Sequence, residues 1–181
     1  MILDIRGTNG SGKSWVVSQL LEVGFNYPIL ENGKQIGSIV PSLDLCVVGK
    51  YTETGGGCDG LRGGVVEVER LVRLLHRRHG NMVLEGIMVS QLFGRFERLA
   101  RELHDYRFLF LDTPLEVCIE RVKARRLTKG NTKPFDPEKN LVRDFNRTRF
   151  IVKGKLERAG HTVKMLDWRN PFDAVLKELK C

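Results

Sequence analysis

Residues 7–14 read GTNGSGKS and match the pattern G-x-x-x-x-G-K-[ST], a spacing that can bind phosphate groups. Glycines in such a loop let backbone N–H groups turn inward around phosphate oxygens. Lys13 would then reach the β and γ phosphates of a nucleotide, and the Ser14 hydroxyl would ligate magnesium. The alternative is an ordinary glycine turn between a strand and a helix. The loop supplies eight candidate binding residues: Gly7, Thr8, Asn9, Gly10, Ser11, Gly12, Lys13 and Ser14.

The sequence around this loop predicts the strand, loop and helix order that phosphate binding needs. An apolar run at residues 2–5 precedes the loop, and apolar residues at helical spacing follow it from Trp15. The amino-terminal end of that helix adds to the attraction for phosphate. Apolar strands and amphipathic helices keep alternating along the chain, which predicts a parallel sheet covered by helices on both faces. We expect strands at 43–48, 82–84, 108–111 and 163–166, and helices at 65–78, 89–104, 114–127, 138–158 and from Pro171.

Two segments between the first helix and residue 64 interrupt this alternation. Residues 27–40 alternate around Asn32-Gly33, a pair that supplies the positive φ angles of a tight antiparallel hairpin. Residues 52–64 follow as a glycine-rich loop that would let the backbone approach a substrate closely. We interpret residues 27–64 as a hairpin and acceptor loop inserted into a single domain spanning residues 1–181.

The composition excludes several classes of protein. The chain has 181 residues, of which 41% are hydrophobic and 29% charged, with a mean hydropathy of −0.22. These values argue against wholesale disorder, and no apolar run approaches the roughly 18 residues of a membrane-spanning helix. The four cysteines form no C-x-x-C pair and fit free thiols rather than disulfides or a zinc site. The start of the chain has no basic segment followed by an apolar one, so we expect a cytoplasmic protein.

The net charge of +8 is concentrated in one segment. Residues 1–90 hold equal numbers of basic and acidic side chains, whereas residues 121–158 hold 13 Lys and Arg against 4 Asp and Glu, a local charge of +9. Such a segment would face polyanions or bound phosphates. The alternative is a solvated helical face that aids solubility.

A second motif ends the apolar run at 108–111. Asp112-Thr113-Pro114 closes this run, and Arg121 and Arg125 follow four residues apart, so that they share a helix face and can converge on a phosphoryl group. At this point most of the chain resembles the P-loop nucleoside, nucleotide and polynucleotide kinases. The resemblance implies a three-layer α/β fold with a parallel core sheet and an arginine-rich lid at about 126–138. It also implies phosphoryl transfer from ATP with Mg²⁺, with Arg121 and Arg125 as catalytic residues and Arg126 among those binding ATP. Arg143 and Arg147 form a second pair on the helix after the lid.

Two carboxylates are candidates for the remaining chemistry. Glu85 ends the strand beside the phosphate-binding loop, where it can hold magnesium through water or act as the base. Asp59 lies among glycines and is our first choice for the general base that takes the proton of a hydroxyl acceptor, although an aspartate there can also cap a turn. Arg62 would supply a bidentate donor to the same substrate.

Two residues could contact a base. Tyr51 can stack on the base of the acceptor or simply pack in the core. Arg169 follows the last strand, where related kinases hold adenine, and can stack on it or belong to a capping turn.

The acceptor segment adds a narrower resemblance. Gly49-Lys50-Tyr51 followed by GGGCDG at 55–60 resembles phage-encoded P-loop kinases, among them those that phosphorylate 5-hydroxymethyl-deoxyuridine within DNA. This resemblance implies DNA as the acceptor and partner. Two alternatives remain open: a nucleoside or nucleoside monophosphate kinase acting on free nucleotides, and an ATP-dependent binding protein without phosphoryl transfer. Monophosphate kinases recognise their acceptor through several arginines, whereas Arg62 is the one arginine between residue 7 and the helix expected at 65–78.

Overall fold

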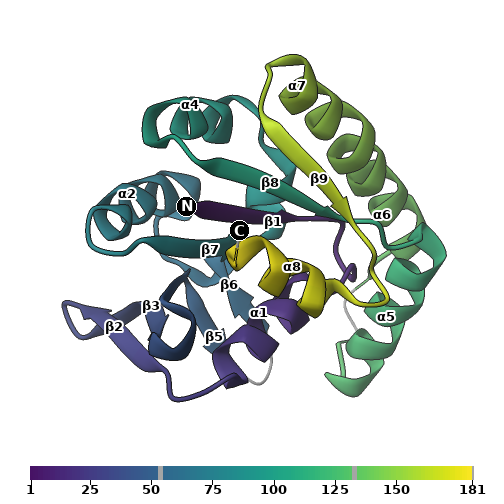
Figure 1. Cartoon of the computed structure of the whole chain (residues 1–181). Coiled ribbons are helices and arrows are strands. Elements are labelled where there is room, and N and C mark those ends of the chain that lie inside the picture. Colours follow the sequence, from purple (N-terminus) through teal and green to yellow (C-terminus); the bar gives the residue numbers. More distant parts are fainter. Residues whose placement is uncertain (53–54, 132–133, 181) are drawn as a thin grey trace.

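The computed structural model describes residues 1–52, 55–131 and 134–180, and a seven-stranded sheet forms its centre (Figure 1). The strand order is β2-β3-β4-β7-β1-β8-β9. Neighbouring strands run parallel from β4 to β9, whereas β2 and β3 form the antiparallel edge. The strands are β1 (Ile2–Arg6), β2 (Tyr27–Glu31), β3 (Lys34–Val40), β4 (Leu45–Val48), β7 (Asn81–Glu85), β8 (Tyr106–Leu111) and β9 (Thr162–Leu166).

Helices cover both faces of the sheet, which confirms the expected three-layer α/β architecture (Figure 1). α1 (Lys13–Glu22) and α8 (Pro171–Leu179) pack on one face. The other face carries α2 (Gly64–His76), α3 (Ile87–Gln91), α4 (Gly94–Leu103) and α7 (Lys153–Arg158). After β8 the chain continues into α5 (Leu115–Thr128), α6 (Pro137–Asn146) and the π-helical segment η3 (Arg147–Val152), which leads directly into α7. No helix of the described residues has the length and apolar character needed to cross a membrane.

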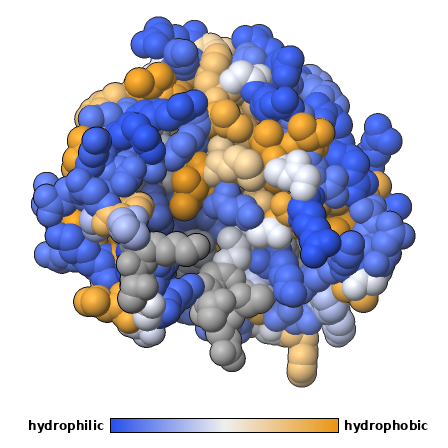
Figure 2. Space-filling model, turned by 180° about the vertical axis from the view of Figure 1, so that it is seen from behind, coloured by the Kyte–Doolittle hydropathy of each residue, from blue (hydrophilic) through white to orange (hydrophobic). Residues whose placement is uncertain are grey.

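Alternation along the strands divides the core into two clusters. Leu3 and Ile5 of β1 pack with α1 and α8, whereas Ile2 packs with α2 and α4. Successive strand side chains point to opposite faces, so a parallel strand buried on both sides must be apolar at nearly every position. Seen from behind, the outer surface is mostly hydrophilic, with apolar residues interspersed (Figure 2).

Two charged residues of β1 are exceptions, because Asp4 and Arg6 are both fully buried. Arg6 donates to the Asp4 carboxylate from Nε and Nη2 at 3.0 and 2.7 Å. Its guanidinium lies over the rings of Phe96 and Phe108, at 5.2 and 4.8 Å from their centroids. Nη1 donates to the Leu92 carbonyl at 3.0 Å. The residue that immediately precedes the phosphate-binding loop is therefore bonded to the segment between α3 and α4.

The predicted hairpin is present at one edge of the sheet. Asn32 and Gly33 form its turn with φ angles of 52° and 72°. The pairing of β2 with β3 shifts register at a bulge between Ile29 and Leu30, one residue after Pro28. β2 is the outermost strand, and its hydrogen-bonded neighbour in the sheet is β3.

Three elements differ from the sequence prediction for a reason that the structure shows. The helix expected at 89–104 is two helices, because Leu92 is extended and its carbonyl accepts the buried Arg6 guanidinium. The strand expected at 43–48 begins at Leu45, because residues 41–43 form a 3₁₀ turn (η1, Pro41–Leu43) that ends with Asp44 at φ 45°. The helix expected at 138–158 is continuous but contains the π segment η3.

The glycine-rich segment is also more ordered than an open loop. β5 (Lys50–Thr52) pairs antiparallel with β6 (Gly55–Gly57), and the 3₁₀ turn η2 (Cys58–Gly60) follows. A Cβ atom at Gly56 would lie 2.2 Å from the Lys50 carbonyl oxygen, so close pairing of these strands requires glycine there. Of the lid expected at about 126–138, residues 126–128 complete α5 and residues 132–133 lie outside the described part of the chain.

Candidate active site

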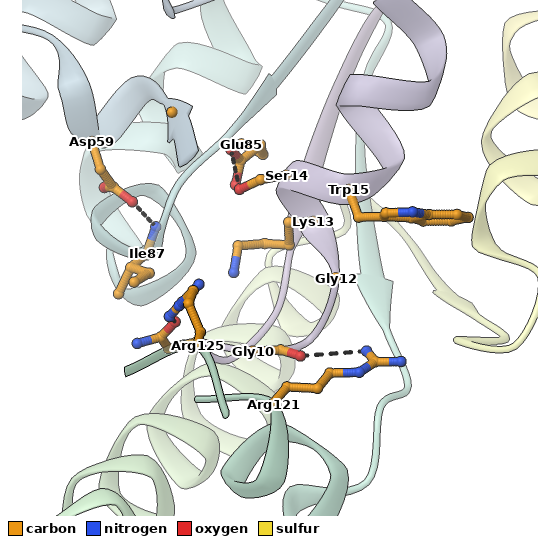
Figure 3. Close-up of a pocket in the computed structure, with 12 residues that line it drawn as sticks. Gly10, Gly12, Lys13, Ser14, Trp15, Asp59, Glu85, Ile87, Arg121 and Arg125 are labelled. Atoms are coloured by element: carbon orange, nitrogen blue, oxygen red, sulfur yellow. Dashed lines mark hydrogen bonds between the residues drawn. The ribbon is translucent and has the colours of Figure 1, made fainter. Parts of the chain in front are cut away.

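The phosphate-binding loop joins the end of β1 to the first turn of α1 (Figure 3). Gly10 and Gly12 have φ angles of 85° and 103°, a conformation that glycine adopts without strain. A Cβ atom at Gly10 would lie 2.5 Å from the Cys118 carbonyl oxygen of α5. Among the described residues no side chain caps α1, and its first turn contains no acidic residue. The amide groups of that turn therefore remain available to an anion.

The loop also holds a buried polar atom that fits a polar ligand. The Ser11 hydroxyl is buried and has no hydrogen-bond partner within the described part of the chain. Unpaired buried hydroxyls are costly, so such an atom beside an uncapped helix end is the feature expected of a loop that closes around phosphate oxygens.

Lys13 is almost fully buried at the base of the pocket, with 5% of its surface exposed. Its Nζ atom donates to the carbonyl oxygens of Gly7 and Thr8 at 2.9 and 3.1 Å. Burial lowers the pKa of this ammonium group, and the negative charge of Glu85 opposes that shift. In Figure 3 the side chain lies between the Ser14–Glu85 pair and Arg125. The amine therefore has loop carbonyls as partners that it can exchange for phosphate oxygens.

Glu85 and Ser14 meet as the sequence predicted. Ile5 pairs with Glu85 across β1 and β7, which places the carboxylate beside the loop. The Ser14 hydroxyl donates to Glu85 Oε1 at 3.0 Å, and the Tyr51 hydroxyl donates to the same oxygen at 3.3 Å. Glu85 is 1% exposed, and burial raises the pKa of its carboxyl, while Lys13 lowers it. A hydroxyl and a carboxylate at this separation are the oxygen ligands that Mg²⁺ prefers.

Asp59 lines the same pocket and also caps a helix. Its Oδ2 and Oδ1 atoms accept the backbone N–H groups of Ile87 and Met88 at 2.6 and 3.0 Å, in the first turn of α3. Capping explains why α3 starts two residues before the position expected from the sequence. Each carboxylate oxygen retains a second lone pair that can accept from a substrate hydroxyl. Asp59 thus caps a distant helix rather than the turn that the alternative expected, and its role as a base stays a prediction.

Two arginines of α5 reach the loop from the opposite side. Arg125 donates from Nη2 to the Asn9 side-chain oxygen at 2.7 Å. Arg121 donates to the carbonyl oxygens of Gly10 and Ser11 at 3.4 and 3.5 Å. Both arginines line the pocket, whose volume is about 330 Å³. Their spacing of four residues therefore brings both guanidinium groups to one site, as the helix period requires.

The pocket thus combines three cationic side chains with two carboxylates. Its lining includes Lys13, Arg121, Arg125, Glu85 and Asp59. Preorganised cations stabilise the charge that a phosphoryl group carries during transfer. Carboxylates provide a metal ligand and a proton acceptor. The arrangement is therefore suited to moving a phosphoryl group onto a hydroxyl.

Comparison with known proteins gives the same class of chemistry. A family model described as 5-hmdU DNA kinase matches residues 1–151. The chain belongs to the 5-hmdU DNA kinase family. It is 32% identical over 191 residues to the 5-hmdU DNA kinase of Pseudomonas phage PaMx11, which covers 99% of this chain and 97% of that protein. It is 30% identical over 155 residues to the 5-hmdU DNA kinase of Bacillus phage SP10, covering 81% of this chain and 24% of that protein. A solved gluconokinase from Sinorhizobium meliloti 1021 aligns with a TM-score of 0.47 and 17% identity, over 98% of this chain and 87% of that one.

A second pocket of this family member adjoins the first and contains Arg169. It has a volume of about 460 Å³ and is lined in part by Trp15, Trp168, Arg121 and Arg169. The guanidinium groups of Arg121 and Arg169 each lie 5.3 Å from the centroid of a Trp168 ring. Arg169, which was predicted to stack on a base, therefore lies among aromatic side chains next to the phosphate-binding loop.

Both tryptophans of this pocket lie outside the site residues predicted from the sequence. Trp15 is 54% exposed and points away from Lys13 in Figure 3, and Trp168 carries the two arginine contacts. No signal in the sequence marks Trp15, because a tryptophan at helical apolar spacing is normally buried and only the structure shows its exposure.

Arg126 is placed differently from Arg121 and Arg125. Its guanidinium lies 4.6 Å from the centroid of the Phe135 ring, and Nη2 approaches the Asn131 carbonyl at 3.5 Å. It lines a neighbouring depression together with Asn9 and Arg125. Consecutive helix residues point about 100° apart, which explains why Arg126 does not share the face of Arg125.

Two of the substrate predictions are not supported by the geometry. Arg62 does not line the pocket of Asp59; it lines a separate depression with Lys50, Glu67 and the turn of the β2–β3 hairpin. The chain turns through η2 between Asp59 and Arg62, and this turn separates the two side chains. Tyr51 packs against the α1-side core and donates to Glu85, so the packing alternative describes it rather than base stacking.

Proposed function

We propose that this kinase transfers the γ-phosphate of ATP, with Mg²⁺, to the hydroxyl of a 5-hydroxymethyl-deoxyuridine in DNA. The observation that carries the proposal is the convergence of Lys13, Arg125, Asp59 and the Ser14–Glu85 pair on one pocket. The family match and the phage relatives called 5-hmdU DNA kinase support this acceptor.

The residues in and around the loop would bind the phosphates of ATP and the magnesium ion. Backbone amides of residues 7–14 would bind the phosphate oxygens, and Lys13 would leave its loop carbonyls to contact the β and γ oxygens. Arg121 and Arg125 would neutralise the charge on the transferred group. Magnesium would be held by Ser14 and Glu85, where it supplies electrostatic stabilisation of the phosphates.

On the acceptor side, Asp59 would act as the general base. Asp59 is exposed at the pocket, whereas Glu85 is buried and already accepts hydrogen bonds from Ser14 and Tyr51. The proton of the hydroxymethyl group would pass to an Asp59 oxygen as the new oxygen–phosphorus bond forms and the bond to the β-phosphate oxygen breaks. The N–H groups of Ile87 and Met88 hold that carboxylate in place for this step.

The depth of the pocket favours an extruded nucleotide. Lys13 and Glu85 are 5% and 1% exposed, so the phosphate to be transferred would lie below the molecular surface. A base stacked within a duplex cannot enter such a site, and enzymes that modify bases commonly rotate the nucleotide out of the helix. The acceptor would therefore enter as a flipped or single-stranded nucleotide.

A transfer assay with γ-labelled ATP tests the proposal. We expect label on oligonucleotides that contain 5-hydroxymethyl-deoxyuridine, and none on the same sequence with thymidine or on the free nucleoside and its monophosphate. Labelling of the free monophosphate with no labelling of DNA would establish the nucleotide-kinase alternative. Absence of transfer to every acceptor, with ATP still bound, would establish a binding protein.

Variants of the two carboxylates test the assignment of the base. Asp59→Asn should keep ATP and DNA binding and lose transfer, whereas Glu85→Gln should raise the magnesium concentration needed for activity. Asp44→Asn is the matched control, because Asp44 is exposed, lies outside the pocket lining and has a positive φ that asparagine tolerates. An active Asp59→Asn together with a Glu85→Gln variant that is inactive at every magnesium level would reverse the two roles.

A further inference from the structure

A third depression lies beside the active site, where the end of α3 meets η3. Its volume is about 540 Å³, larger than the 330 Å³ of the phosphate pocket. Residues of α3, α6, η3 and α7, together with one residue between α3 and α4, line it: Gln91, Phe93, Arg143, Asn146, Arg147, Ile151, Val152 and Lys155. The reaction described above uses none of these side chains.

The charges of this depression fit one phosphate group and its sugar or base. Three of its lining residues are cationic, two carry amides and none is acidic. Arg147 donates from Nε to the Gln91 carbonyl at 2.9 Å, and both of its terminal nitrogens remain without a partner among the residues that the structure describes. Arg143 has an ion pair at 3.5 Å with its neighbour Asp144, and its side chain is 75% exposed. Such an exposed pair holds the guanidinium weakly and leaves it able to bind phosphate.

The rest of the lining is apolar and suited to a sugar or a base. The Phe93 ring lies 5.8 Å below the Lys155 ammonium, and the Ile151 side chain is 52% exposed. Nucleotides present a charged phosphate next to a flat base, and proteins that bind single strands combine cations with aromatic platforms for this reason. A basic wall beside an aromatic ring therefore fits a nucleotide better than an inorganic anion.

The π-helical segment η3 contributes to this arrangement. The Lys153 N–H bonds to the Thr148 carbonyl, five residues back, and this wider turn carries Arg147 and Ile151 on the wall of the depression. π-Helical turns are rare, and they occur frequently at functional sites.

The short helix α3 connects this depression to the active site. Ile87, its first residue, lines the phosphate pocket, and Gln91, its last, lines the depression. Four residues of α-helix advance by about 6 Å. The two sites therefore lie at opposite ends of one short helix, close enough for neighbouring nucleotides of one strand to occupy both.

We propose that this depression binds the phosphate and sugar of a nucleotide flanking the target base in the same DNA strand. The proposal rests on the proposed function in that the acceptor is DNA. Arg143, Arg147 and Lys155 would hold the flanking phosphate while the target nucleotide enters the phosphate pocket. The site would favour DNA over a free nucleotide, because a free nucleotide has no second phosphodiester to place there.

A double variant, Arg143→Ala with Lys155→Ala, tests the site in steady-state kinetics and in fluorescence-anisotropy binding. We expect the KM and the Kd for modified oligonucleotides to rise by about 10-fold, with kcat and the KM for ATP unchanged. The matched control, Arg98→Ala with Lys177→Ala, removes the same two charges from exposed positions of α4 and α8. Equal weakening by both double variants would show that net charge alone is responsible and would overturn the proposal.

Oligonucleotides in which one phosphate is replaced by an uncharged group would show which phosphate the depression binds. Oligonucleotides would carry a single methylphosphonate at successive positions around the target, and the Kd of each would be measured for the wild type and the double variant. We expect one position within about three nucleotides of the target to weaken wild-type binding and to have no further effect on the double variant. If every position affects both proteins alike, the depression does not bind a flanking phosphate. If the wild type binds DNA in this way but transfers no phosphate to it, the proposed function fails while the site stands.

Discussion

At the scale of single residues, the reactive groups of the pocket are buried, and burial disfavours their charged forms. Burial lowers the pKa of Lys13 and raises the pKa of Glu85, so each charged group depends on the other and on hydrogen-bond donors or acceptors of the loop. Functional sites commonly contain neighbouring acidic and basic groups whose pKa values are shifted in this way.

We expect Lys13→Ala to abolish phosphoryl transfer while ATP binding partly persists. The loop would keep its backbone amides but lose the cation that contacts the β and γ oxygens. Single-turnover assays combined with equilibrium binding of ATP would separate the two effects. A turnover rate equal to that of the wild type would contradict the assignment of the loop.

Glu85→Gln should remove a loss of stability that the wild type without ligands shows as the pH rises above about 4.5. The pKa of Glu85 is raised in the folded state, so its ionised form is disfavoured there, and folding becomes less favourable as the pH rises through that pKa. Below about pH 4.5 the carboxyl is protonated in both states, and the effect disappears. Thermal unfolding of both proteins from pH 4 to pH 7 would measure this, and a Tm difference between variant and wild type that moves against the variant as the pH rises would show the sign to be wrong.

Arg125→Ala should lower kcat more than it weakens ATP binding, because a guanidinium facing the transferred group acts mainly on charge in the reacting state. We expect a loss of about 2 to 4 kcal/mol in transition-state stabilisation, by analogy with the removal of one preorganised donor. Arg98→Ala on α4 serves as the control. A reduced Tm with an unchanged kcat for the folded protein would instead indicate a structural role for Arg125.

At the scale of elements, α3 joins the parts of the site. Its first turn is capped by Asp59, and the Ser90 hydroxyl accepts the Gly7 N–H at 3.2 Å. The segment after it accepts the Arg6 guanidinium through Leu92. A displacement of the phosphate-binding loop would therefore be transmitted to the carboxylate on the acceptor side through five residues of helix.

The acceptor loop depends on glycine at one position next to this helix. Gly57 has φ 85° and ψ −160°, and a Cβ atom there would lie 2.1 Å from Glu85 Oε1. We expect Gly57→Ala to cost about 1 to 3 kcal/mol of stability and to displace the Glu85 carboxylate, with a large loss of kcat. Gly60→Ala is the matched control, because a Cβ atom there meets nothing within 4 Å. Equal behaviour of the two variants in unfolding and activity assays would contradict the predicted steric role.

Elements fixed by local pattern could be predicted from the sequence, and those fixed by distant contacts could not. The apolar run of β1, the Asn32-Gly33 turn and the GKS loop each follow from residues adjacent in the chain. The break at Leu92 depends on Arg6, which is 86 residues away in the sequence. The spacing of Arg121 and Arg125 predicted a shared site, whereas the separation of Arg62 from Asp59 depended on a turn whose direction the sequence does not specify.

At the scale of the whole molecule, the excess positive charge follows α5 to α7, which flank both the phosphate pocket and the depression at η3. Long-range attraction from such a surface speeds the encounter with a polyanion and is weakened by salt. A DNA acceptor and a free nucleotide therefore predict different responses to ionic strength.

We expect the KM for modified single-stranded oligonucleotides to rise by roughly 20-fold between 50 and 200 mM salt, as about three phosphate contacts would require. The KM for ATP should change far less over the same range, because it reports a short ligand held by a closed loop. Both KM values would be measured over the same series of concentrations of a single salt. A flat response for the oligonucleotide would argue against contacts with its backbone.

The outer strand β2 contains features that hinder the pairing of a further strand with this edge of the sheet. Tyr27 and Leu30 of β2 are 58% and 60% exposed, a surface on which another strand could add by hydrogen bonding. Pro28 has no N–H to offer, and the bulge at Ile29 and Leu30 twists the strand where a regular ladder would need it straight. β2, one of the two edge strands of the sheet, is thereby kept from templating self-assembly without a further helix to cover it.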